Sequence, residues 1–304
     1  MNFKKGEVLF FNKPFGWTSF KVVGHARYHI CRRIGVKKLK VGHAGTLDPL
    51  ATGVMIVCTG KATKRIEEFQ YHTKEYVATL RLGATTPSYD LEHEIDATYP
   101  TEHITRELVE EVLTHFIGAI DQVPPAFSAC MVDGKRAYEL ARKGEEVELK
   151  AKQLVIDEIE LLECRLDDPE PMIQIRVVCS KGTYIRTLME DVGNALGCGA
   201  HLTALRRVAV GDLSVSGAVT LDQLAVLSEA ERLAWLSPPD ALLQSLPSVR
   251  LDESAANRFC HGNPIVISPE GALGKCRVYG QGRLLGVGEI DVSGCVKPRR
   301  LVCA

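Results

Sequence analysis

The sequence contains no stretch of apolar residues long enough to span a bilayer. Its first residues, MNFKKGEVLFFNKPFGW, place a short apolar patch after two lysines, but Asn12, Lys13 and Pro14 interrupt that patch and no small-residue cleavage site follows. We therefore expect no secretory signal peptide. Together these absences predict a cytoplasmic protein that does not act at a membrane.

The sequence also lacks the short motifs that identify several enzyme classes. It has no G-x-x-x-x-G-K-[ST], no G-x-G-x-x-G after an expected strand, no H-E-x-x-H and no G-x-S-x-G. The nine histidines show no metal-ligand spacing. Nothing in the sequence therefore points to a nucleotide cofactor, to zinc or to serine hydrolase chemistry, and we expect neither a metal nor a cofactor.

None of the ten cysteines belongs to a C-x-x-C pair. A zinc site or a disulfide framework would be a functional reason for so many cysteines, but these are scattered in apolar surroundings. We expect reduced, mostly buried thiols that pack as small hydrophobic side chains.

Charge is unevenly distributed along the 304 residues, although the net charge is only -1. Residues 1–81 carry fifteen Lys and Arg against five Asp and Glu, whereas residues 82–133 carry one Arg against ten Asp and Glu. Such segregation predicts one basic and one acidic face. The densest basic run, ARYHICRRIGVKKLK (26–40), is typical of a solvated helix or loop, but its position before residues 41–53 favours contact with phosphates.

Strand and helix patterns mix without regular alternation, which predicts an α+β fold. GVMIVCTG (53–60) is typical of a buried strand, and KEYVATLRLGATT (74–86) alternates like a half-buried one. Helices are expected from an N-cap at Ser19, from an N-cap at Thr105 to a stop at Gly118, and before a stop at Gly197. A proline-rich segment (237–253) predicts a boundary before a small β-rich domain.

The segment VGHAGTLDPLATG (41–53) places one carboxylate, Asp48, among small and apolar residues. Asp before Pro commonly starts a turn or caps a helix, which is the ordinary interpretation. The small neighbours also leave room for another molecule and would partly desolvate the carboxylate. The segment SKGTYIRT (180–187) offers Tyr184 and Arg186, and an arginine facing Asp48 would keep it ionised, as a nucleophile requires.

Six segments make the pattern specific. In order they are NKPFGWTS (12–19), VGHAGTLDPLATGVM (41–55), KEYVATLRLGATTPSYD (74–90), QVPPAFSACMVDGKRAYELAR (122–142), CSKGTYIRTL (179–188) and GCGAHLTALRR (197–207). Together they resemble the TruB family of tRNA pseudouridine synthases, in the bacterial form that modifies uridine 55 of the TΨC loop. The later segments HGNPI, VYGQGRLLGVGE and VKPRRL resemble, more loosely, a PUA RNA-binding domain.

The resemblance implies a pseudouridine-synthase fold, with a mixed, largely antiparallel central sheet flanked by helices and loops. It also implies a catalytic domain (1–245), a small β-rich PUA-like domain (249–304) and a monomer that binds the T-arm of tRNA. The family reaction detaches uracil from ribose, turns the base and rejoins it through carbon 5. This isomerisation needs no metal and no redox cofactor.

The resemblance further implies three catalytic residues. Asp48 matches the nucleophile, and whether it attacks the sugar or the base, or removes a proton, stays open. Tyr76 matches the tyrosine that stacks on the flipped base, which must leave the folded loop to react. Arg186 matches the arginine that pairs with the catalytic carboxylate.

The same resemblance implies substrate-binding residues around that centre. Besides Tyr76, these are His43, which would contact the RNA loop, Tyr184 and Leu205, which would line the uracil pocket, and Lys13, in a supporting role. The two arginines that follow Leu205, Arg206 and Arg207, are interpreted as ordinary surface charges.

Two alternatives remain from the sequence. One is a pseudouridine synthase for another RNA, such as a guide-dependent archaeal or eukaryotic relative, although the chain lacks their long lysine-rich tails. The other is a non-catalytic RNA-binding or tRNA-folding protein, for which Asp48 would be dispensable.

Overall fold

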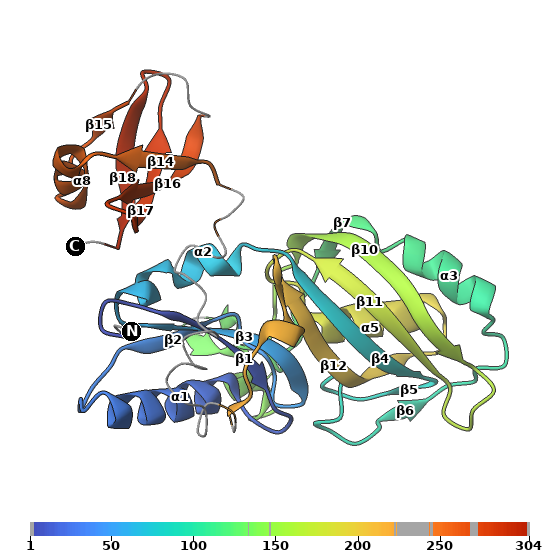
Figure 1. Ribbon diagram of the computed structural model, residues 1–304. Helices are drawn as coiled ribbons and strands as arrows, with labels where there is room; N and C mark the ends of the chain where they lie inside the picture. The colour runs from blue at the N-terminus through green and yellow to red at the C-terminus, as the bar shows by residue number, and fades with distance from the viewer. Residues whose placement is uncertain are drawn as a thin grey trace.

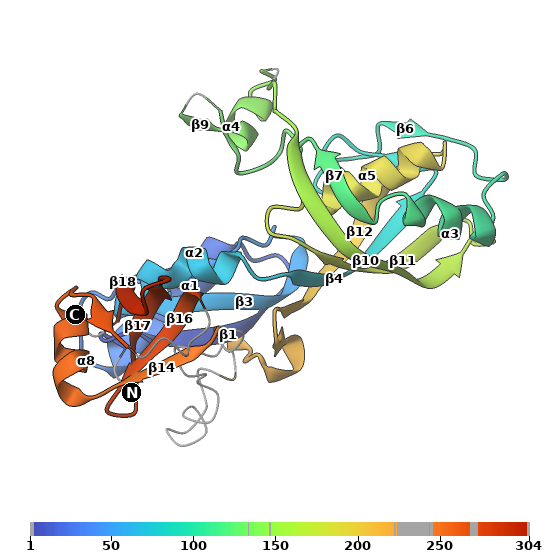
Figure 2. The same ribbon diagram turned by 90° about the horizontal axis from the view of Figure 1, so that it is seen from above.

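The computed structural model describes residues 3–132, 134–145, 147–221, 223, 243, 246–267 and 273–302. Residues 237–242, 244 and 245 of the expected boundary segment lie outside the described residues. No helix in the described ranges is long and apolar enough to cross a membrane. Figures 1 and 2 show a large sheet with its helices and, above α2 (Ile66–Gln70), a separate small β-rich unit formed by the C-terminal residues.

The large sheet has nine strands and is mixed, as expected. Along its main path the order is β1 (Val8–Lys13), β3 (Ala51–Thr59), β12 (Ala200–Val210), β4 (Lys74–Leu82), β11 (Met172–Cys179), β10 (Lys152–Arg165) and β7 (Gly118–Gln122). Two short strands, β2 (Val41–Ala44) and β13 (Leu213–Ser214), pair with β3 and β12. Only the β3–β12 pairing is parallel, so the sheet is largely antiparallel.

The middle of this sheet carries the main core. Along β4 the side chains alternate as expected, with Tyr76, Ala78, Leu80 and Leu82 buried. Their core cluster includes buried residues of α5 (Ile185–Ala195) and α3 (Arg106–Thr114), and Figures 1 and 2 show α5 lying along the sheet beside β12. The predicted stop of α5 is confirmed, because Gly197 follows the C-cap with φ 73°.

Two predicted helix ends are wrong. The N-cap of α1 (Ser19–Arg33) is Thr18, whose hydroxyl accepts a hydrogen bond from the Lys21 amide, so Ser19 is already inside the helix. The N-cap of α3 is Thr105 as predicted, but α3 ends at Thr114, and Gly118 instead begins β7. Thr18 and Ser19 both carry a hydroxyl that can cap a helix, whereas no glycine marks the end of α3.

The C-terminal residues form their own five-stranded sheet. Its order is β14 (Ser248–Leu251), β16 (Gly274–Gly280), β17 (Arg283–Ile290), β18 (Cys295–Leu301) and β15 (Ile265–Val266). Helix α8 (Glu253–Cys260) packs on it, with Phe259 fully buried in a separate core. This confirms the small β-rich domain, whereas its exact limits, 1–245 and 249–304, stay a prediction.

Short elements complete the described chain. They are the 3-10 helices η1 (Gly60–Arg65) and η2 (Val215–Gly217), the helix α4 (Ala137–Ala141), and the strand pairs β5 (Ala84–Thr85) with β6 (Ala97–Thr98) and β8 (Met131–Val132) with β9 (Lys135–Arg136). Eight of the described cysteines are free, as expected, but Cys260 is disulfide-bonded. The prediction of reduced thiols throughout is therefore wrong at that position.

Candidate active site

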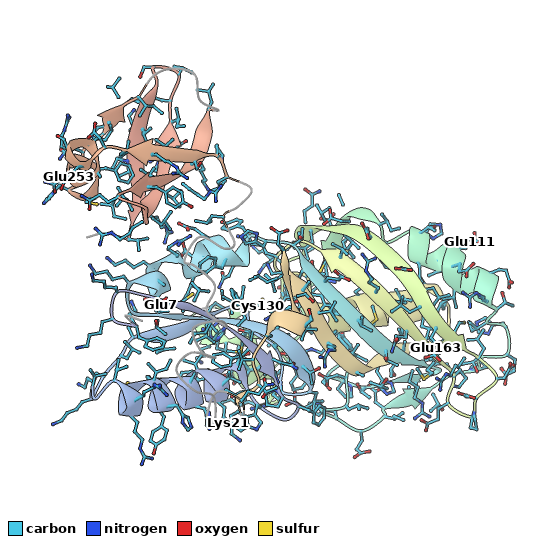
Figure 3. The ribbon with its side chains drawn as sticks, in the orientation of Figure 1. Glu7, Lys21, Glu111, Cys130, Glu163 and Glu253 are labelled. Atoms are coloured by element: carbon cyan, nitrogen blue, oxygen red, sulfur yellow. The ribbon has the colours of Figure 1, made fainter. Side chains whose placement is uncertain are left out.

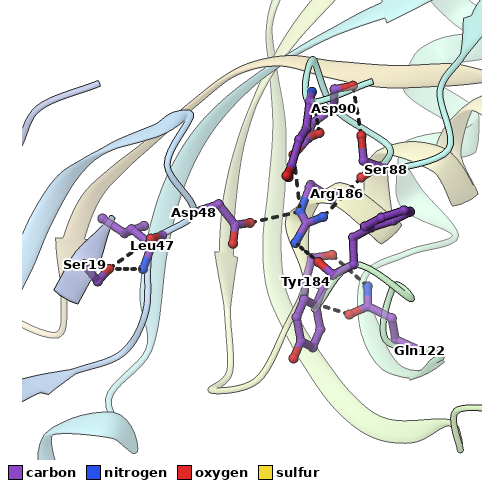
Figure 4. Close-up of polar contacts among 10 residues, drawn as sticks. Ser19, Leu47, Asp48, Ser88, Asp90, Gln122, Tyr184 and Arg186 are labelled. Carbon is purple, nitrogen blue, oxygen red and sulfur yellow. Dashed lines mark hydrogen bonds and ion pairs between the residues drawn. The ribbon is translucent and has the colours of Figure 1, made fainter. Parts of the chain in front are cut away.

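The carboxylate of Asp48 lies in the loop between β2 and β3, which we call the Asp48 loop (residues 45–50). The Ser19 hydroxyl, at the start of α1, both accepts a hydrogen bond from the Leu47 amide and donates one to the Leu47 carbonyl, each at 2.9 Å. Ser19 is 3 % exposed, so water does not compete for these bonds. The residue before Asp48 is therefore fixed to α1, while the Asp48 side chain points the other way (Figure 4).

The residue after Asp48 is fixed as well. The Lys13 ammonium donates to the carbonyls of Pro49 at 3.2 Å, Trp17 at 2.6 Å and Pro14 at 3.0 Å, and the Gly16 amide donates to Pro49 at 2.9 Å. Lys13 is fully buried, and this burial lowers its pKa to about 8. The resemblance in sequence predicts that Lys13 contacts the substrate. Its side chain is instead enclosed by protein, so in this arrangement it cannot reach a substrate and positions the Asp48 loop.

Arg207 on β12 holds the start of the same loop. Its guanidinium donates to the carbonyls of Gly45 at 3.3 Å and Val54 at 2.7 Å, and its charge opposes the rise in the pKa of the Tyr76 hydroxyl. Arg207 is 1 % exposed, so the interpretation of this residue as a surface charge is wrong. A Cβ on Gly53 would lie 2.1 Å from the Arg207 carbonyl oxygen, which is why β3 needs glycine where it pairs with β12.

These anchors leave Asp48 facing Arg186 of α5, as predicted. Arg186 Nε lies 2.9 Å from Asp48 Oδ2 and 3.7 Å from Asp90 Oδ2. The other guanidinium nitrogens donate to the carbonyls of Ser88 at 3.2 Å and Phe127 at 3.0 Å (Figure 4). The Arg186 side chain is 5 % exposed while that of Asp48 is 40 % exposed. A rigidly held cation thus supports a carboxylate that another molecule can still reach.

Competing effects set the pKa of Asp48. Burial raises this pKa above its usual value, and the nearby Asp90 carboxylate raises it further, whereas Arg186 opposes the rise. The charged form of Asp48 therefore depends on Arg186. Sequence reasoning missed Asp90, which is 5 % exposed; its only signal was its place at the end of the segment 74–90.

Tyr76 and Leu205 come from neighbouring strands beside this carboxylate. Leu205 lines a small pocket together with Asp48, Arg186 and Asp90. Tyr76, on β4, is 8 % exposed, and burial raises the pKa of its hydroxyl. Leu205 thus lies at the Asp48 pocket and Tyr76 on the adjacent strand, and their contact with a substrate base stays a prediction.

Tyr184 and His43 flank the centre on other elements. Tyr184 is the N-cap of α5, and the Gln122 side chain binds both its backbone amide and its carbonyl, at 2.8 and 3.1 Å (Figure 4). The Tyr184 hydroxyl lies 3.2 Å from Cys130 Sγ, and burial raises its pKa. His43 lies on β2, opposite Val57, and burial lowers the pKa of its imidazole.

With this geometry established, family models match the chain over most of its length. Residues 32–185 match the TruB family pseudouridylate synthase N-terminal domain. Residues 186–244 match the tRNA pseudouridylate synthase B C-terminal domain, and residues 247–302 match the C-terminal domain of pseudouridine synthase II TruB. The chain belongs to the TruB family. As a TruB-family pseudouridylate synthase it is an isomerase.

Relatives of the TruB family align with this chain over different shares of its length. A tRNA pseudouridine synthase B of Bacteroides thetaiotaomicron is 90% identical over 213 residues, which is 70% of this chain and 89% of that one. One of Bacteroides fragilis is 75% identical over 79% of this chain and 98% of its own. That of Dechloromonas aromatica is 47% identical over 97% of this chain and 95% of its own. The two Bacteroides relatives are thus shorter than this TruB-family chain.

Solved structures share the TruB-family fold. A Cbf5-Nop10-Gar1 complex aligns with a TM-score of 0.71 at 24% identity, over 99% of this chain and 86% of that one. A chain of an H/ACA RNP bound to a substrate RNA containing 2'-deoxyuridine aligns with a TM-score of 0.70 at 23% identity, over 99% and 86%. At these identities the likeness establishes the fold alone.

Proposed function

We propose that this chain converts a uridine of tRNA to pseudouridine, and that the target is uridine 55 of the TΨC loop. The relatives that align with part of this chain and those that align with nearly all of it are both named tRNA pseudouridine synthase B, which supports tRNA as the substrate. The observation that carries the proposal is the Asp48–Arg186 ion pair of 2.9 Å, because it places an accessible carboxylate beside the pocket that Leu205 lines.

The reaction moves a bond within one nucleotide. The bond from the ribose C1′ to N1 of uracil breaks, the base turns, and a bond from C1′ to C5 forms. C5 then loses its proton and N1 gains one, so atoms and electrons balance without another reactant. Asp48, ionised by Arg186, starts bond cleavage, and Tyr76 with Leu205 holds the detached base.

The base must leave its stack before it reaches Asp48. The pocket beside Asp48 is small in the described structure and is lined by Arg186 and Leu205, and the flipped base would enter there. Tyr184 and His43 would contact the rearranged RNA. The protein would act as a monomer in the cytoplasm.

Tritium release from tRNA transcripts that contain 5-tritiated uridine tests this function, because the proton leaves C5 only if the base is rejoined there. The wild-type chain should release tritium from one position of an otherwise unmodified tRNA, and a transcript with cytidine at position 55 should release none. Release from the cytidine transcript would show a different target. The absence of release from any tRNA would refute the proposed reaction.

A further inference from the structure

Helix α1 presents a line of mutually contacting aromatic and cationic side chains, which we call the α1 ladder. Its residues are Trp17, Lys21, His25, Tyr28, His29 and Arg32. At the N-terminal end of α1 the Lys21 ammonium lies 4.2 Å from the centroid of the Trp17 ring. The Trp17 ring meets His25 edge-on, with centroids 5.5 Å apart. Figure 3 labels Lys21 on α1.

The contacts continue toward the end of α1. The rings of His25 and His29 lie 4.4 Å apart, and the His29 ring meets Tyr28 edge-on at 5.3 Å. The Arg32 guanidinium then donates to the Tyr28 hydroxyl at 3.2 Å. Tyr28 is 57 % exposed, and Lys21 and Arg32 are exposed as well, so the ladder is open to another molecule.

The ladder lies in a strongly basic stretch of the chain. Between Glu7 and Asp48 the sequence has eight Lys and Arg and no acidic residue. Within the described ranges neither Lys21 nor Arg32 pairs with a carboxylate. Tyr28 is the exposed ring of the ladder, Trp17, His25 and His29 are partly buried, and the cations Lys21 and Arg32 stand at its two ends. An exposed ring beside unneutralised cations suits a nucleic-acid strand, since the bases stack on rings and the phosphates meet the cations.

The ladder begins beside the active site. The Trp17 carbonyl and the Pro49 carbonyl both accept hydrogen bonds from the Lys13 ammonium, and the Gly16 amide also donates to Pro49. Trp17 is therefore joined through one side chain to the residue that follows Asp48. From Ser19 to Arg32 the helix then extends by about 20 Å, away from the Asp48 loop.

We infer that the α1 ladder binds the nucleotides of the RNA strand that follow the target nucleotide outside the pocket. Tyr28 offers an exposed ring for stacking on an unpaired base, and Lys21 and Arg32 neutralise phosphates on either side of it. The inference rests on the proposed function, because it takes the RNA in the pocket as its starting point. It adds a surface that none of the predicted site residues occupies.

The test compares two double variants in the Asp48→Asn background, so that RNA binding is measured without turnover. One variant is Lys21→Ala with Tyr28→Ala. The matched control, Tyr99→Ala with Arg106→Ala, removes one exposed tyrosine and one exposed cation from the acidic segment 82–133. Binding of a fluorescently labelled tRNA transcript is followed by anisotropy at several salt concentrations.

The ladder variant should bind this tRNA at least about fivefold more weakly, and the control should match the parent. Lys21→Ala alone should reduce the slope of log affinity against log salt by about one phosphate contact, whereas Tyr28→Ala alone should leave the slope unchanged. Affinity within twofold of the parent, or an equal loss in the control, overturns the inference. Binding to anionic lipid vesicles that depends on Lys21 and Tyr28, with unchanged RNA affinity, overturns it too. Tritium release by the chain with its native Asp48 reports separately on the proposed function.

Discussion

Arg186 Nε lies 2.9 Å from Asp48 Oδ2 and 3.7 Å from Asp90 Oδ2, so one guanidinium serves two carboxylates. Asp90 is buried and the Asp48 side chain is 40 % exposed, so only Asp48 of the two is accessible to another molecule. Asp90 helps to hold the cation, and Asp48 keeps a carboxylate that another molecule can reach.

Replacing Asp48 with Asn should abolish turnover while tRNA binding persists. The amide has nearly the same shape but cannot act as an anionic nucleophile or base, so tritium release should fall by at least about a thousandfold. Filter binding of the same transcript should change little. A non-catalytic RNA-folding protein would keep its function in this variant, so turnover near the wild-type level would support that alternative instead.

The same variant should reveal the cost of an ionised Asp48. Burial raises the pKa of this carboxyl in the folded state, so ionisation is less favourable in the folded chain than in the unfolded one. Wild-type stability is therefore fully present below the unfolded pKa and declines as pH rises through the folded pKa. Asp48→Asn does not titrate, so it should be more stable than the wild type at pH 7, with the difference vanishing near pH 4. Chemical denaturation at both pH values measures this, and an Asn variant that is less stable at pH 7 would contradict the sign.

Arg186→Lys should shift the pH dependence of turnover. Lysine keeps a positive charge but cannot reach the Ser88 and Phe127 carbonyls and Asp48 at the same time, so it stabilises the Asp48 anion less well. The pKa of Asp48 should rise, and the acidic limb of the rate profile should move to higher pH. Rates of tritium release from pH 5 to 9 measure the shift. A lower rate with an unmoved acidic limb would show that Arg186 acts on structure alone.

Arg207→Lys should weaken both folding and catalysis. The carbonyls of Gly45 and Val54 would lose their shared donor, at about 1–3 kcal/mol for each buried group left unpaired. The Asp48 loop would then be less well fixed, and a shift of about 1 Å is enough to reduce kcat by about a hundredfold. Arg206→Lys is the matched control, because Arg206 is the exposed neighbour on the same strand. Equal effects of the two changes would exclude the positioning role.

Much of this site could be predicted from the sequence, and the misses share one physical cause. The alternation of β4, the α5 stop at Gly197 and the meeting of Asp48 with Arg186 follow from local patterns and the ordered motifs. The burial of Lys13 and Arg207 does not, because both depend on backbone carbonyls of distant segments: Pro49 for Lys13, besides its neighbours Pro14 and Trp17, and Gly45 and Val54 for Arg207. A sequence displays a charge but not the carbonyls that enclose it. Strand alternation alone places Arg207 on the same face as Leu205, and this was the available signal.

The C-terminal domain should contribute to affinity and not to chemistry. It has its own sheet and core, and its described contact with the large domain runs from Arg300 to Glu67, at 2.8 Å, to Glu68 and to the Lys64 carbonyl. The shorter Bacteroides relatives match 70% and 79% of this chain, so a catalytic unit can be smaller than the full chain. Deleting residues from Val249 onward should therefore weaken tRNA binding about tenfold or more, because a tethered second contact is lost.

At saturating tRNA the truncated chain should retain most of its turnover, since Asp48, Arg186 and the anchors of the Asp48 loop all lie outside the deleted residues. Binding isotherms and tritium-release rates measured on the same preparations separate the two effects. Arg300→Ala in the full chain is the control: it breaks the contact with Glu67 and Glu68 but keeps the domain, and exposed ion pairs contribute little, so its affinity should stay near the wild-type value. If the deletion leaves affinity unchanged, the C-terminal domain does not bind tRNA. If Arg300→Ala weakens binding as much as the deletion does, the docked position of the domain matters more than its own RNA contacts.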